Sequence, residues 1–81
     1  MANTIDFEIK EYLGVMSENM NGWSKELNLV SWNKMPAKFD IREWASDHER
    51  MSRGITLNEE EAYRVMELLA EHFDMDLVDK E

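Results

Sequence analysis

The sequence predicts an α+β domain in which four antiparallel strands are followed by one C-terminal helix. Two patterns indicate this fold. Apolar and polar residues alternate in short stretches between residues 5 and 57, as is typical of half-buried strands. Beyond residue 58 the apolar residues instead recur at helical spacing. We expect strands at about 5–16, 23–33, 38–44 and 54–57, and a helix at about 59–73.

The first two predicted strands each contain one irregularity. In the first strand Glu11 occupies a position where the alternation calls for an apolar residue, so we expect a β-bulge there. Residues 17–22 are polar and contain asparagine and glycine, which favour a turn. In the second strand the apolar positions change phase between Leu29 and Val30. This change indicates either a bulge or a strand with both faces occupied.

The third strand begins after a turn at Pro36 and has two distinct sides. Phe39 and Ile41 lie on one side. The other side carries Lys38, Asp40, Arg42 and Trp44. Residues 45–53 lack periodicity and are interpreted as a loop, and Gly54 begins the short fourth strand.

The helix has a clear beginning. Asn58 is a favourable N-cap, and Glu61 three residues later completes a capping-box pattern. One apolar face follows, formed by Ala62, Val65, Met66, Leu69 and Phe73. We expect this face to cover the sheet or a partner helix, and residues 74–81 to fray.

The size and composition set further limits. At 81 residues the chain is expected to form one domain, 1–81. So short a chain buries only a little over ~60% of its unfolded surface, and a homodimer would add to that burial. The absence of cysteine fits a reducing compartment. Because we see no secretory leader and no apolar run of roughly 20 residues, we expect a cytoplasmic protein that does not cross a membrane.

Charge is distributed unevenly along the chain. The net charge is −9, yet seven of the nine Lys and Arg residues lie before Gly54. Residues 1–57 have a balance of −2, whereas residues 58–81 have a balance of −7. The acidity therefore belongs mostly to the C-terminal segment, and we expect the acidic helix to lie away from a bound polyanion.

The side of the third strand that carries Lys38, Arg42 and Trp44 suits single-stranded nucleic acid. Exposed bases stack on indole rings for about 1–3 kcal/mol each, and cations beside the rings neutralise phosphates. Lys25 and Arg53 extend this path at neighbouring strand ends, and Lys34 extends it from a loop.

Two other interpretations remain open at this point. The tryptophans are equally compatible with core positions, and the cations with a solvated strand surface. An acidic protein-interaction adaptor that uses the helix face is the alternative function. The triplet Asp47-His48-Glu49 is a poor catalytic or metal site because adjacent side chains diverge, and Asp47 is better interpreted as a turn cap. We expect no enzymatic activity, no metal and no cofactor.

Two segments resemble a known family. They are Phe39–Trp44 and Arg53–Asn58, and they are similar to the transcriptional positive cofactor four (p15 coactivator) family. Residues 23–33 also resemble its small bacterial YdbC-type members. The resemblance covers about residues 5–70 and implies a curved four-stranded sheet, a symmetric homodimer and binding of single-stranded DNA with little sequence preference.

The resemblance also implies roles for individual residues. Arg42, Trp44 and Arg53 stand where the family places DNA-contacting side chains, and Lys25 and Lys34 match more loosely. Eukaryotic members carry an aromatic pair before the loop, a longer loop and a serine-rich arm, all of which this chain lacks. RNA stays an alternative ligand, and transcription, replication, repair and recombination stay alternative processes, with their machinery as partners.

Overall fold

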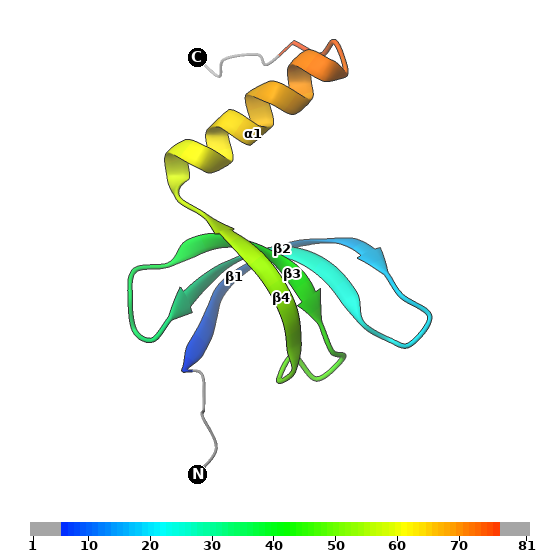
Figure 1. The fold of residues 1–81 in the computed structure, drawn as a ribbon, viewed down its shortest axis with the longest axis vertical. Helices are drawn as coiled ribbons and strands as arrows, with labels where there is room; N and C mark the ends of the chain where they lie inside the picture. The colour runs from blue at the N-terminus through cyan, green and yellow to red at the C-terminus, as the bar shows by residue number, and fades with distance from the viewer. Residues whose placement is uncertain (1–5, 77–81) are drawn as a thin grey trace.

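Four antiparallel strands form one open sheet in the computed structural model, which describes residues 6–76. The elements are β1 (Phe7–Glu18), β2 (Ser24–Trp32), β3 (Lys38–Trp44), β4 (Met51–Leu57) and the helix α1 (Glu59–His72). Each strand pairs with the next one in sequence, so the sheet order is β1-β2-β3-β4. The sheet is strongly arched, and α1 projects from its convex side (Figure 1). The predicted order of four strands and one helix is confirmed.

The strand boundaries differ most at β4. This strand begins at Met51, whereas the sequence pattern predicted a start at Gly54. Met51 pairs with Trp44 and Gly54 pairs with Arg42, with a register shift between the two pairs. The extra residue interrupts the period-two alternation, and that is why these residues appeared as loop. Ile5 and residues 77–81 of the expected tail lie outside the described residues.

The bulge expected at Glu11 is confirmed. The pairing of β1 with β2 shifts between Ile9 and Glu11, and two further shifts follow along β1. By contrast, β2 pairs with β3 without any shift, Leu29 facing Phe39 and Val30 facing Lys38. The phase change in β2 therefore reflects a strand with both faces occupied.

The concave side of the sheet holds a partly polar core. Strand pairing places Asn28 opposite Asp40, and both side chains are buried. Glu26 is buried beside them and accepts hydrogen bonds from Ser24 and Asn28. The side-chain oxygen Oδ1 of Asn28 in turn accepts from the backbone N–H of Leu13 at 3.2 Å. Such a network fixes one arrangement of the strands, because each buried polar group is specific about its partner.

The helix begins as the sequence predicted. The Asn58 side chain accepts from the Glu61 backbone N–H at 2.7 Å, and the Glu61 carboxylate accepts from the Asn58 N–H at 2.9 Å. Beyond this capping box α1 leaves the sheet (Figure 1), and side chains such as Val65, Met66 and Leu69 are exposed. An apolar groove of about 460 Å³ separates the first turns of α1 from the convex side of β2, β3 and β4. Among the described residues, 6–76, α1 is the one helix, and it is neither long nor apolar enough to cross a membrane.

Candidate nucleic-acid interface

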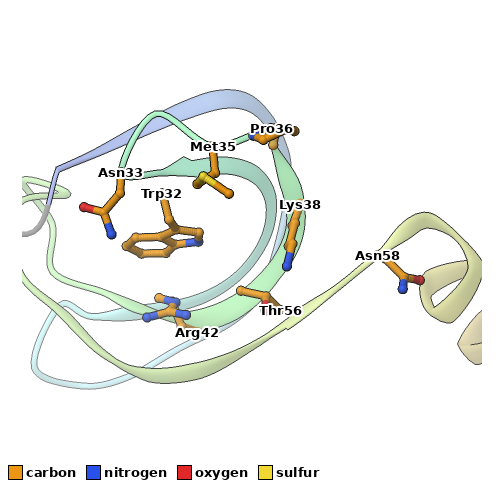
Figure 2. A pocket seen from close by; sticks show the side chains of 9 residues that line it. Trp32, Asn33, Met35, Pro36, Lys38, Arg42, Thr56 and Asn58 are labelled. Carbon is orange, nitrogen blue, oxygen red and sulfur yellow. The ribbon is translucent and has the colours of Figure 1, made fainter.

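A groove of about 780 Å³ opens where β2 turns into β3, and Trp32 stands at its centre (Figure 2). Trp32 is a partly exposed residue, and its indole Nε1 is buried without a hydrogen-bond partner among residues 6–76. The lining consists of Trp32, Asn33, Met35, Pro36, Ala37, Lys38, Arg42, Thr56 and Asn58. An aromatic ring and two cations thus share one open surface, as a site for single-stranded nucleic acid requires.

A tight turn forms one rim of the groove. The backbone N–H of Met35 donates to the Trp32 carbonyl at 2.9 Å, and the two residues between them have positive φ, 53° at Asn33 and 64° at Lys34. Positive φ at both central positions is typical of the type I′ turn, whose twist matches that of a hairpin. Lys34 is exposed in this turn, between the lining residues Asn33 and Met35. Met35 lies over the groove (Figure 2).

Arg42 forms the floor of the groove and is held by three interactions. Its Nε donates to Asp40 Oδ1 at 2.7 Å, and its guanidinium carbon lies 4.5 Å from the centre of the Trp32 ring. Nη1 also donates to the Ser52 carbonyl at 3.4 Å. The Arg42 side chain is 13% exposed and that of Asp40 is 0% exposed. The guanidinium is therefore presented to the groove in a fixed orientation, which lowers the entropic cost of binding an anion.

Gly54 makes room for this arginine. A Cβ atom at residue 54 would collide with Arg42 Cβ and with the Ile41 carbonyl oxygen. Because Gly54 and Arg42 are paired across β3 and β4, only a hydrogen at this position lets the arginine side chain cross the neighbouring strand.

Trp44 is buried and does not line the groove. Its residue exposure is 0%, and its ring packs against Phe7 at a centroid distance of 5.3 Å and against His48 at 5.8 Å. The expectation that Trp44 stands on a free face is wrong for this structure, because the curved sheet closes over that position. Trp32, which is not among the residues selected from the sequence, is partly exposed and lines the groove. Its position directly before the Asn33-Lys34 turn is the sequence feature that could have indicated an exposed ring.

A comparison with known families identifies the chain. The family described as Transcriptional Coactivator p15 (PC4) matches residues 19–68, which span β2, β3, β4 and most of α1. The chain belongs to the PC4 family. A protein of Treponema pallidum (strain Nichols) is 41% identical over 63 residues, covering 78% of this chain and 74% of that protein, and its name is "Uncharacterized protein". PC4 membership suggests single-stranded DNA binding and a coactivator-like function.

The six residues predicted to bind nucleic acid fall into separate places in this PC4-family chain. Lys38 and Arg42 line the Trp32 groove, and Lys34 lies in the turn at its rim. Lys25 and Arg53 share a shallow pocket of about 470 Å³ that Arg42 also lines, and Lys25 pairs across the strands with Glu43. The groove therefore gathers half of the predicted residues.

The triplet around His48 has a structural role in this PC4-family sheet. Asp47 Oδ1 accepts from the Glu49 backbone N–H at 2.9 Å, which confirms Asp47 as a turn cap. His48 has a φ of 59° and places Nε2 2.9 Å from Glu26 Oε2. Within residues 6–76 no cluster of three His, Cys, Asp or Glu residues is arranged to hold a metal ion.

The buried carboxylate of Glu26 stays ionised. Burial acts to raise its pKa, but hydrogen bonds from Ser24, Asn28 and His48, together with the His48 charge, outweigh burial and lower the pKa below its ordinary value of 4.5. The charge is thus stabilised inside the fold and contributes nothing to an open surface.

Proposed function

We propose that this chain binds single-stranded DNA, without sequence preference, in the Trp32 groove. The observation that carries the proposal is the guanidinium of Arg42 fixed 4.5 Å from the ring of the partly exposed Trp32. A base stacks beside Trp32, and Lys34, Lys38 and Arg42 neutralise the flanking phosphates. Stacking on one indole contributes about 1–3 kcal/mol and does not depend on base identity.

The geometry of the groove supports entry of a single base. Figure 2 shows Arg42 on one side of Trp32 and Met35 on the other. Met35 is 62% exposed, and its flexible side chain can move aside for an incoming ring. A duplex offers no free base faces, so it binds more weakly.

The charge distribution supports the same site. Neither Lys34 nor Lys38 forms a salt bridge with any residue between 6 and 76, so both charges are available to phosphates. The acidic residues Glu59, Glu60 and Glu61 lie in the first turn of α1. There they interact favourably with the helix dipole, and their charge directs the polyanion toward the Lys34 side of the groove.

We also propose that two copies pair through the apolar helix face. Tyr63, Val65 and Met66 line the groove between α1 and the sheet and are 55%, 37% and 41% exposed. So large an apolar area on so small a protein favours a partner, and a second copy presents a matching surface. The pairing leaves the Trp32 groove on the concave side free.

From these proposals we infer a non-enzymatic, coactivator-like role in transcription or DNA maintenance. We infer that the protein acts in the cytoplasm of a bacterium. An acidic adaptor that binds a protein through α1 is the second candidate, favoured by the same exposed side chains.

The deciding experiment is fluorescence anisotropy with a dye-labelled oligo-dT of about 20 nucleotides at two salt concentrations, with matching duplex as competitor. Salt-sensitive binding that the duplex fails to displace supports the DNA-binding proposal. No binding at low salt would exclude it and leave the adaptor.

A further inference from the structure

A second aromatic and cationic pair lies at the opposite end of β2 from the Trp32 groove. Trp23, just before β2, is partly exposed, and the guanidinium carbon of Arg50, just before β4, lies 5.9 Å from the centre of its ring. Arg50 is exposed and forms no salt bridge within the described part of the chain. The pair repeats, in a more open form, the relation between Trp32 and Arg42.

The backbone at this end of the sheet is well ordered by hydrogen bonds. The N–H of Asn19 donates to the Trp23 carbonyl at 2.7 Å, which closes the turn between β1 and β2. The N–H of Ala45 donates to the Arg50 carbonyl at 2.9 Å, which closes the loop between β3 and β4. Both side chains therefore start from fixed positions, and little loop entropy is lost when a ligand binds them.

Two cations predicted to bind nucleic acid, Lys25 and Arg53, lie outside the Trp32 groove and near the Trp23 end of the sheet. Both line one pocket, together with Glu43. Glu43 accepts a hydrogen bond from the Asn19 side chain at 3.1 Å and limits the attraction of this region for phosphates. Stacking on Trp23, and not charge alone, is then what makes the region suitable for a single strand.

We propose that Trp23 and Arg50 form a second contact for single-stranded DNA, separate from the Trp32 groove. This inference rests on the proposed function. Trp23 and Trp32 are nine positions apart in the chain, which is at most roughly 30 Å at the rise of a strand. A single strand covers that distance with about nine nucleotides if its bases stay stacked at the 3.4 Å rise of a duplex, and with about five if it is extended. A short oligonucleotide thus occupies either the Trp32 groove or the Trp23–Arg50 contact, whereas a long one reaches both contacts.

The test compares labelled oligo-dT of about 4 and about 20 nucleotides on the wild type and on Arg50→Ala, by anisotropy at two salt concentrations. Arg64→Ala, which removes an exposed cation on α1, is the matched control. We expect Arg50→Ala to weaken the longer oligonucleotide about fivefold or more and to reduce its salt slope by about 0.7, with little effect on the shorter one. Trp23→Leu, checked for its circular dichroism, should give the same length-dependent loss.

Three outcomes would overturn the inference. Unchanged affinity of Arg50→Ala for the longer oligonucleotide shows that Arg50 makes no contact, while the wild-type binding still supports the groove. Equal losses for both lengths show one continuous site, and an equal loss in Arg64→Ala shows a general charge effect. If the wild type binds neither oligonucleotide, the proposed function itself fails.

Discussion

The guanidinium carbon of Arg42 lies 4.5 Å from the centre of the Trp32 ring, while Nε of the same arginine donates to the buried Asp40. One side chain thus links the core of the sheet to the partly exposed Trp32. Variants of these residues affect stability and binding to different degrees, and the following predictions separate the two.

Trp32→Ala should reduce affinity for single-stranded DNA by about 1–3 kcal/mol, since it removes the stacking surface. Trp44→Ala should instead lower the free energy of unfolding by about 3–5 kcal/mol, because it leaves a cavity under the sheet. Urea denaturation and oligo-dT binding measured on both variants distinguish the roles. A folded Trp44→Ala with a selective binding defect would restore Trp44 as the stacking residue.

Asp40→Ala should destabilise the fold by about 3–5 kcal/mol, because Arg42 would keep its charge in a mostly buried place without a partner. Asp40→Leu combined with Arg42→Met should recover much of this stability, as apolar replacements of buried ion pairs often do. The double variant should nevertheless bind single-stranded DNA more weakly. Full affinity in a folded double variant would show that Arg42 contacts no phosphate.

Gly54→Ala should cost about 1–3 kcal/mol of stability, since the added methyl group collides with Arg42 and with the Ile41 carbonyl. Gly14→Ala is the control, because a Cβ atom there meets nothing within 4 Å. Thermal melts of the two variants should differ by several degrees. Equal melting temperatures would mean that β4 can shift away from β3 without loss.

Acid should destabilise the protein partly through Glu26. Its folded pKa lies below the ordinary value of 4.5, so the unfolded chain binds the proton more tightly and stability rises with pH. The contribution is complete above that ordinary value and is lost as the pH falls through the folded pKa. Glu26→Gln should therefore show a flatter dependence of the urea midpoint as the pH falls below 4.5. An identical slope in the variant would assign acid sensitivity to other carboxylates.

Met66→Glu should dissociate the proposed dimer, because a carboxylate would enter the apolar interface. Met66 is 41% exposed in the single chain, so the monomer should stay folded. Leu68→Glu is the matched control, since Leu68 is 46% exposed but does not line the apolar groove. Sedimentation velocity measures both. A monomeric wild type, or a dimer that survives Met66→Glu, would contradict pairing through this face.

The sequence predicted the fold well where local chemistry determines it. The alternation of 38–44 correctly separated Phe39 and Ile41 from Arg42 and Trp44, and Asn58 with Glu61 marked the helix start. Alternation tells which residues share a face, but not how far the sheet curves over that face. For this reason Trp44 was expected to be open although it is buried, and Trp32 was overlooked.

The three indoles occupy three different environments: Trp44 has no exposure, Trp32 lies in the groove and Trp23 lies at the far end of β2. Each part of the molecule therefore carries its own optical reporter. In single-tryptophan variants, emission from Trp44 follows folding, while Trp32 and Trp23 separately report what approaches each end of the sheet.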